Sequence, residues 1–177
     1  MKNPTVLVFQ YGSNCLDSEI NSAKRLRGDA NFVGIAETVE DFEIAFDVFS
    51  MNRNCAAADI VRRPGGKVWG ALYKIPEYLI KRDTAKSQRR NSLDAIEGEG
   101  TNYKRESIDV RRTNGEIVQV TTYIVKSPKD GLKTSIEYVR LIVCGLRERG
   151  VPPEYITTVK LIAAANNPGI AAEIERT

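Results

Sequence analysis

The chain is 177 residues long, which suits one domain over residues 1–177 with a single hydrophobic core. Its 42% apolar and 28% charged residues are the balance of a soluble globular protein, and a net charge of +3 means that acids offset most basic residues. The absence of histidine excludes Ser-His-Asp and Cys-His nucleophilic sites in their usual form, and histidine-ligated metal sites. A general base must therefore be a carboxylate or, less often, Lys, Tyr or Cys.

Cysteine use and apolar segments favour a cytoplasmic protein. Cys15, Cys55 and Cys144 are widely spaced and odd in number, so neither a disulfide framework nor a zinc site is indicated. No segment approaches the roughly 20 apolar residues that a membrane helix needs. Residues 1–10 are typical of a first strand and not of a signal peptide. We therefore expect a cytoplasmic location and no membrane partner.

Arginine pairs at 62–63, 89–90 and 111–112 are the features that a nucleic-acid-binding protein would use. No aromatic residues are interleaved with them, and such clusters are more often solvated surface. We therefore expect no nucleic-acid partner. The rival class would show an affinity that falls steeply with salt.

The first part of the chain predicts strands and one helix. Residues 6–9 form a short apolar run, and Asp17 is placed to N-cap a helix over residues 18–26. Residues 42–49 alternate in hydrophobicity, as half-buried strands do. Further strands are expected at residues 32–39, 59–63 and 67–75, the last two as a hairpin around Pro64-Gly65-Gly66.

The middle of the chain predicts an excursion and a second hairpin. Residues 76–96 are polar and interrupted, which favours two helical pieces or a flexible excursion. Asn114-Gly115 is a strong hairpin signal between strands at residues 103–112 and 116–126, because both turn residues tolerate positive φ.

The last part of the chain is helical. Thr134 and Glu137 have capping-box spacing, which predicts a long helix up to Gly150. Pro152-Pro153 starts a shorter helix through Ala165. This order of elements excludes a regular βαβ alternation. It predicts an α+β fold whose mixed β-sheet curls into a partial or closed small barrel, with flanking helices and a helical C-terminal tail.

The segment Tyr11-Gly12-Ser13-Asn14 directly follows the first buried strand. Glycine lets the chain turn sharply and lets a ligand approach the backbone, and successive amides can point at one anionic site. The alternative is an ordinary strand-to-helix turn. The segment Val68-Trp69-Gly70-Ala71-Leu72-Tyr73 is best interpreted as a core strand, although its glycine also fits a close backbone contact.

A carboxylate stands out in the segment from Leu93 to Gly100. Leu93 and Ile96 have helical spacing and anchor the segment, so Glu97 leaves the core where glycines open the chain. This placement can set a carboxylate at the rim of a pocket. The alternative is a helix end with two solvated acids, Glu97 and Glu99, because most glutamates are exposed.

Taken together, in this order and spacing, these segments resemble the γ-glutamyl cyclotransferase family, including its AIG2-like branch. The resemblance runs from about residue 6 to residue 165, with a looser middle. The tail at residues 144–155 looks like the animal γ-glutamylcyclotransferase branch, whereas the spacing from Glu97 to Tyr103 looks more like the AIG2-like branch. The matching residues are Tyr11-Gly12-Ser13-Asn14, Val68-Trp69-Gly70, Leu72-Tyr73, Leu93-Asp94, Glu97-Gly98, Tyr103 and Thr122-Tyr123.

The resemblance implies an enzyme that releases 5-oxoproline from small γ-glutamyl compounds. The substrate's α-amine attacks its own γ-carbonyl, and Glu97 serves as the general base and then as the general acid. The substrate-binding residues that it implies are Tyr11, Gly12, Ser13, Asn14 and Tyr103, with the amides of residues 12–14 as donors for the oxyanion or the α-carboxylate. Neither a metal nor an organic cofactor is implied.

Several alternatives stay open. Cys15 stands where the family more often has an aliphatic residue, and the polar residues 81–90 resemble an insertion that bears on rim shape and substrate range. The tail favours γ-glutamyl amino acids or dipeptides, with a γ-glutamylamine or a biosynthetic amide as runner-up. A non-catalytic AIG2-like binding module is a further rival, but burying an unpaired Glu97 would gain a pure binder little. The sequence leaves the leaving group and a homodimer undecided.

Overall fold

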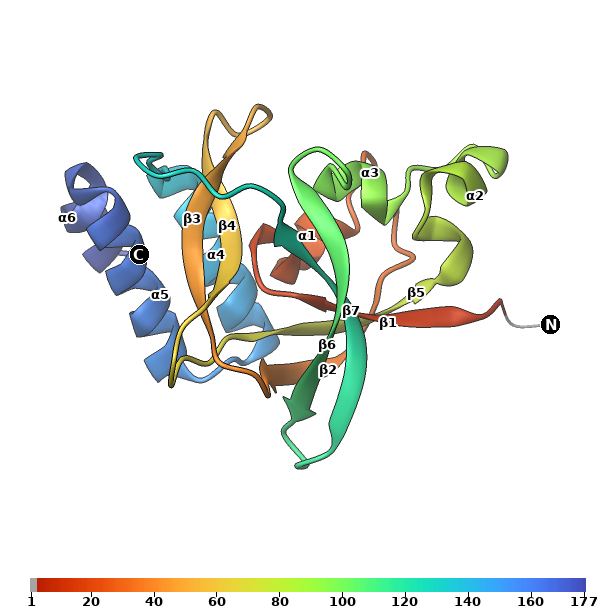
Figure 1. Ribbon diagram of the computed structural model, residues 1–177, viewed down its shortest axis with the longest axis horizontal. Helices are drawn as coiled ribbons and strands as arrows, with labels where there is room; N and C mark the ends of the chain where they lie inside the picture. Colours follow the sequence, from red (N-terminus) through yellow and green to blue (C-terminus); the bar gives the residue numbers. More distant parts are fainter. Residues whose placement is uncertain (1–2) are drawn as a thin grey trace.

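The computed structural model describes residues 3–177 and confirms the expected α+β fold (Figure 1). Within these residues five strands close a barrel in the order β1-β5-β2-β6-β7. The sheet is mixed because β1 pairs with β7 in parallel and the other neighbours are antiparallel. The barrel strands are β1 (Thr5–Gln10), β2 (Asn31–Thr38), β5 (Trp69–Pro76), β6 (Tyr103–Arg112) and β7 (Ile117–Val125).

Two further strands and the helices surround the barrel (Figure 1). Strands β3 (Phe42–Ser50) and β4 (Cys55–Arg62) form a separate antiparallel pair. Helices α4 (Ile136–Arg149), α5 (Pro153–Asn166) and α6 (Ala171–Glu175) pack on one another, and α5 also packs on β3. None of the helices in residues 3–177 is long and apolar enough to cross a membrane. The short elements are η1 (Ser13–Cys15), α1 (Asp17–Ile20), η2 (Glu77–Leu79), α2 (Arg82–Ser87), α3 (Leu93–Glu97) and η3 (Pro168–Ile170).

The hairpin expected between residues 59–63 and 67–75 is wrong. β4 pairs with β3, whereas β5 pairs with β1 and β2. At Ala58 the backbone of β4 bonds to side chains from elsewhere: Tyr103 Oη donates to its carbonyl at 2.6 Å, and its N–H donates to Tyr138 Oη at 3.1 Å. Two tyrosine hydroxyls thus bond to the backbone of β4 at Ala58, and β5 pairs within the barrel.

The helix expected over residues 18–26 is much shorter than predicted. α1 ends at Ile20, and Asp17 is its first residue and not its N-cap. Asn21 explains the early end, because its side-chain amide donates to the Ala30 carbonyl at 3.0 Å and accepts the Ala30 N–H at 2.9 Å. Such side-chain bonds to the backbone compete with helix continuation. The chain then turns back and brings Arg25 towards η1.

The helical tail differs from expectation in its details. Ser135, not Thr134, caps α4, and its Oγ accepts the N–H of Tyr138 at 3.2 Å. The backbone of Thr134 is instead tied to the end of α5, whose Asn166 Oδ1 accepts the Thr134 N–H at 2.8 Å. α5 is as long as α4 and not shorter. The two helical pieces expected in residues 76–96 are present as α2 and α3.

Two carboxylates lie inside the β3-β4 pair. Asp47 sits at the register shift between Phe46 and Val48, and Asp59 is 1% exposed and accepts the N–H of Val125 at 2.8 Å. Burial raises the pKa of Asp59 to about 7, and the neighbouring Asp47 carboxylate adds to the rise. Burial also raises the pKa of Asp47.

We expect the carboxylates of Asp47 and Asp59 to make the stability of the fold depend on pH. The raised pKa of Asp59 means that its contribution to stability is complete below about pH 4 and is lost as pH rises through about 7. Asp59→Asn keeps the acceptor for Val125 and should melt higher than the wild type at pH 8, with a smaller gap at pH 5. Asp109→Asn, at an exposed position of β6, should follow the wild type. An unchanged pH dependence in Asp59→Asn would contradict this assignment.

Candidate active site

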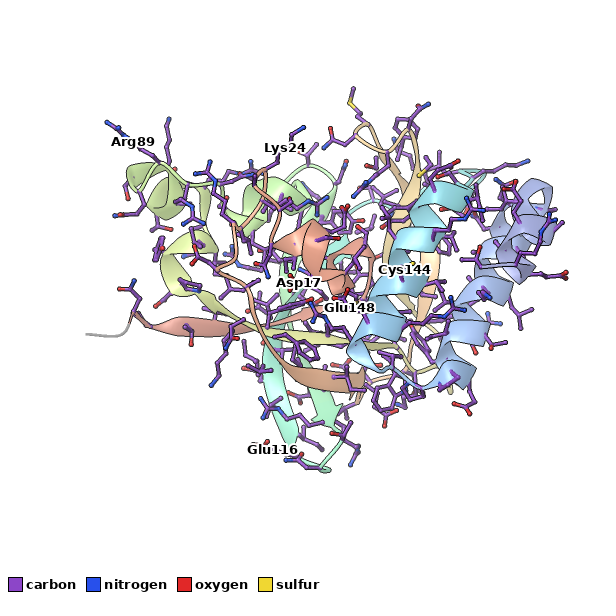
Figure 2. The ribbon with its side chains drawn as sticks, turned by 180° about the vertical axis from the view of Figure 1, so that it is seen from behind. Asp17, Lys24, Arg89, Glu116, Cys144 and Glu148 are labelled. Carbon is purple, nitrogen blue, oxygen red and sulfur yellow. The ribbon has the colours of Figure 1, made fainter. Side chains whose placement is uncertain are left out.

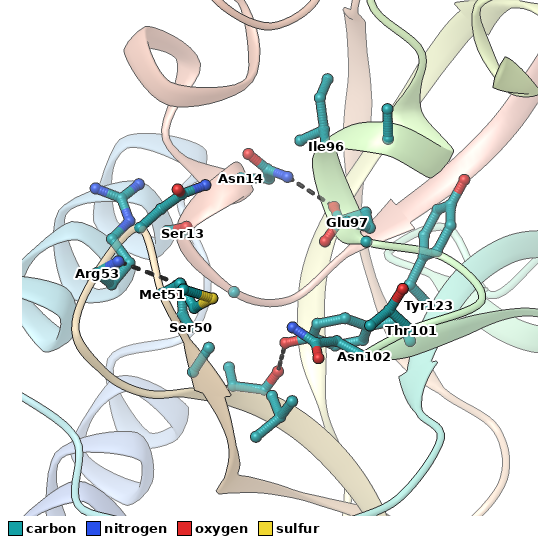
Figure 3. A pocket seen from close by; sticks show the side chains of 18 of the residues that line it. Ser13, Asn14, Ser50, Met51, Arg53, Ile96, Glu97, Thr101, Asn102 and Tyr123 are labelled. Carbon is teal, nitrogen blue, oxygen red and sulfur yellow. Dashed lines mark hydrogen bonds between the residues drawn. The ribbon is translucent and has the colours of Figure 1, made fainter.

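A cavity of about 390 Å³ opens where the end of β1, the turn at η1, the tip of the β3-β4 pair and α3 meet (Figure 3). This volume lies within the range of small-molecule sites. The residues singled out in the sequence, which are far apart along the chain, all line it: Tyr11, Gly12, Ser13, Asn14, Glu97 and Tyr103.

Glu97 enters the cavity from the last turn of α3. Ser92 starts this helix, because its Oγ accepts the N–H of Ala95 at 3.0 Å, and the fully buried Leu93 anchors it in the core. Gly98 ends the helix at φ +68, in the left-handed region that glycine adopts without strain. A five-residue helix with both ends fixed therefore sets the direction of the Glu97 side chain.

Two side-chain amides hold one oxygen of Glu97. Gln10 Nε2 and Asn14 Nδ2 donate to Glu97 Oε1 at 3.1 and 2.7 Å, and Figure 3 shows Asn14 pointing at the carboxylate. Oε2 accepts no hydrogen bond from residues 3–177. The carboxylate is thus fixed through one oxygen, and the other is available to a bound molecule.

The surroundings of Glu97 favour a carboxylate that holds its proton more tightly than usual. Burial raises the pKa of Glu97, because a half-buried carboxylate loses hydration. Arg25 and the amides of Gln10 and Asn14 act in the opposite direction. A carboxyl with a raised pKa is suited to accept and return protons near neutral pH.

Arg25 links Asn14 to the charges around the cavity. It donates to Asn14 Oδ1, which turns the amide nitrogen of Asn14 towards Glu97. Its other nitrogen lies 3.5 Å from Glu19, which also pairs with Arg53. Sequence analysis missed Arg25, because the expected helix included it, whereas α1 ends at Ile20.

The turn from Gly12 to Cys15 is braced from behind. Tyr73 Oη donates to the carbonyls of Asn14 and Cys15 at 3.1 and 3.0 Å, and Arg149 Nε donates to the Cys15 carbonyl at 3.0 Å. These bonds hold the carbonyls on the far side of the turn. Ser13 and Asn14 are the first two residues of η1. The N–H groups at the start of a helix have no acceptor within that helix, so these two can donate to a bound molecule.

The tyrosine hydroxyls around the cavity bond mostly to other protein groups and so hold the walls of the cavity in place. Tyr11 Oη donates to the Tyr123 carbonyl at 2.6 Å, and Tyr103 Oη donates to Ala58. Tyr123 Oη donates to Asp94 Oδ1 at 2.7 Å, and Arg105 pairs with the same carboxylate at 2.5 Å. The Tyr103 hydroxyl already donates its proton to Ala58, so it can only accept a hydrogen bond from a substrate. This restricts the substrate-binding role expected for Tyr103 to that of an acceptor.

Sequence analysis missed several lining residues for identifiable reasons. Gln10 carried a signal, a polar side chain at the end of an apolar strand. Tyr138 lies on α4, and the tip residues 49–53 are the end of β3 and the loop that follows it, so only the tertiary fold brings them to the cavity. Within residues 3–177 no cluster of three or more His, Cys, Asp or Glu side chains could hold a metal ion. A metal-free mechanism stays a prediction.

Comparison with known proteins shows which family the chain belongs to. Residues 67–159, just over half of the chain, match the AIG2-like family. The chain belongs to this family. A gamma-glutamylcyclotransferase of Mus musculus is 28% identical over 97% of this chain and 86% of its own length.

Solved structures share the fold. An uncharacterized human protein is 26% identical, with a TM-score of 0.74 over 88% of this chain and 86% of that one. A structure named gamma-glutamyl cyclotransferase has the same TM-score at 24% identity, over 98% of this chain and all of that one. The closed barrel with its flanking helices is thus a fold that known structures also have.

Proposed function

We infer that the chain is a γ-glutamylcyclotransferase with Glu97 as its general acid and base. The observation that carries the proposal is the half-buried Glu97 carboxylate, which has one oxygen fixed and one free in a cavity that the Gly12–Asn14 backbone also lines. The relatives named gamma-glutamylcyclotransferase support the general activity. The role of Glu97 and the range of substrates are inferred from the geometry of the site.

The reaction is a ring closure within one molecule. The substrate's α-amine attacks its own γ-carbonyl carbon, and the bond to the leaving nitrogen breaks, giving 5-oxoproline and an amine. Orienting the two ends of the γ-glutamyl group can be worth an effective molarity on the order of 10⁵ M. Holding the substrate folded is thus a large part of what this cavity contributes.

Proton transfer is the part that the substrate cannot do alone. The α-ammonium carries three protons, and the lactam nitrogen keeps one. The other two end on the leaving nitrogen, which departs as an ammonium, so no water is consumed. Glu97 Oε2 takes these two protons from the α-nitrogen one after the other and passes each to the leaving nitrogen, while Gln10 and Asn14 hold Oε1.

The turn beside Glu97 serves the developing negative charge. When the γ-carbonyl becomes tetrahedral, its oxygen gains charge, and fixed N–H donors stabilise it. Ser13 and Asn14 supply such donors from a turn that Tyr73 and Arg149 brace. The same donors suit the α-carboxylate of the substrate.

The test is a panel of γ-glutamyl compounds with mass detection of 5-oxoproline. It includes γ-glutamyl amino acids, γ-glutamyl dipeptides and γ-glutamylamines, because the leaving group distinguishes the main candidates. Release of 5-oxoproline supports the proposal. Binding of these compounds without turnover would instead identify a non-catalytic module.

Arg25 gives a prediction on pH. Arg25→Met removes the positive charge that lowers the pKa of Glu97, so more of Glu97 is protonated and inactive as a base at low pH. The acidic limb of kcat/KM should move to higher pH, with a loss of about 2- to 5-fold at pH 6 and less at pH 8. Lys24→Met, an exposed neighbour on the same turn (Figure 2), is the control. An unshifted acidic limb in Arg25→Met would rule out this role.

A further inference from the structure

One end of the cavity is buried and the other is open to solvent. This difference determines which end each half of a substrate occupies. The side chains around the reacting end, such as Gln10 and Asn14, are buried. The lining residues at the tip of the β3-β4 pair are open, with Phe49 42% and Met51 86% exposed. On the proposed function, the α-amine and γ-carbonyl lie at Glu97, so the leaving group extends towards this tip.

The charges around the cavity are unbalanced. Of the lining side chains that the structure describes, Glu97 is acidic and Arg25, Arg53 and Arg82 are basic. Glu19, which pairs with both Arg25 and Arg53, and Glu97 supply two negative charges against the three positive charges of these arginines, so one positive charge is not offset. Arg82 donates to the backbone carbonyls of Asp94 and Glu99, which carry no net charge. The cavity thus favours an anionic molecule.

Arg53 is placed to use this charge. It lies in the loop between β3 and β4, and Figure 3 shows it with Met51 on the side of the cavity away from Glu97. Its contact with Glu19 is made through Nη2, whereas Nη1 and Nε donate no hydrogen bond within residues 3–177. These two nitrogens lie on opposite sides of the guanidinium, so each can donate one charge-assisted hydrogen bond to a carboxylate while Nη2 stays with Glu19.

We propose that Arg53 is a specificity-determining residue that binds the carboxylate of an amino-acid leaving group. The inference rests on the proposed function and adds that the Arg53 guanidinium recognises the leaving group of the substrate. Met51 and Phe49 offer the amino-acid side chain an apolar surface beside that carboxylate. A leaving group with extra positive charge, such as a polyamine, meets an unfavourable field at this mouth.

The experiment pairs two substrates with one difference. γ-Glutamyl-alanine and γ-glutamyl-alaninamide share the reacting group, and only the first carries the leaving-group carboxylate. The wild type should turn over the first with a kcat/KM about 10- to 50-fold higher, as expected for a charge-assisted hydrogen bond. Arg53→Met should lose about that factor on γ-glutamyl-alanine and less than about 3-fold on the amide, while Arg53→Lys should recover part of the loss.

The amide substrate also reports on the catalytic site of each variant, because its turnover needs Glu97 and not the carboxylate contact. Arg62→Met is the matched control, since Arg62 lies on β4 away from the cavity and pairs with Glu40. It should leave both substrates unchanged. Equal losses on both substrates in Arg53→Met, or no preference in the wild type, would overturn this inference alone. The absence of 5-oxoproline from either substrate in the wild type would overturn the proposed function as well.

Discussion

Replacing Glu97 with glutamine is expected to lower the rate of 5-oxoproline release by about 10²–10⁴-fold, because an amide cannot accept a proton from the α-ammonium. The loss can be larger, since the same group returns a proton to the leaving nitrogen. The substituted side chain would keep an oxygen for the amides of Gln10 and Asn14, so the shape of the site is retained. The measurement is a side-by-side assay of 5-oxoproline release at saturating substrate.

The stability of Glu97→Gln separates catalysis from folding. Because burial raises the pKa of Glu97, ionising it costs folding free energy, and stability is lost as pH rises through the folded-state pKa. The glutamine variant escapes this cost and should melt no lower than the wild type at pH 8. Glu99→Gln is the control, since Glu99 is not among the cavity-lining residues, and it should stay within a few-fold in rate. Equal losses in both variants would show that another residue is the base.

Gly145→Ala is expected to have the second-largest effect, although residue 145 does not line the cavity. A Cβ atom there would lie 2.5 Å from the Leu16 nitrogen and 2.8 Å from the Cys15 carbonyl carbon, so α4 or the turn must move. Overpacking of this kind costs about 1–3 kcal/mol of stability. Displacing the turn by about 1 Å should lower kcat/KM by about 10²-fold, because the Ser13 and Asn14 donors move with it.

The matched control is the next residue on the same helix. Cys144 is exposed, and Figure 2 shows it on the outward side of α4. Cys144→Ala should leave both the melting temperature and kcat/KM near those of the wild type. If Gly145→Ala matched it in both measurements, the close approach of α4 to the turn would not be what positions the donors.

Local patterns predicted the strands well and one of the helices poorly. The alternation in residues 42–49 and the Asn114-Gly115 turn identified β3 and the β6-β7 hairpin, since both signals depend on near neighbours. β4 pairs with β3 and bonds at Ala58 to the hydroxyls of Tyr103 and Tyr138, contacts that no local pattern reveals. The early end of α1 depended on Asn21 bonding to Ala30, nine residues away.

Some residues of the candidate site could likewise be predicted from the sequence, and others could not. Glu97 and the Gly12–Asn14 turn were found because a family resemblance joined weak local signals. Arg25 and Arg53 were not found, because each reaches the cavity through irregular backbone and a shared partner, Glu19. Their contribution is electrostatic, and charge in a cavity depends on tertiary structure.

The most direct test of the central claim follows the atoms of one substrate. γ-Glutamyl-alanine labelled with ¹⁵N at the α-amine of the glutamyl group is incubated with the enzyme in H₂¹⁸O, and the products are analysed by mass spectrometry. Ring closure by the substrate's own amine predicts 5-oxoproline that carries the ¹⁵N label and no ¹⁸O, with unlabelled alanine. Glutamate that carries ¹⁸O would show that water attacks the γ-carbonyl, and would contradict the account.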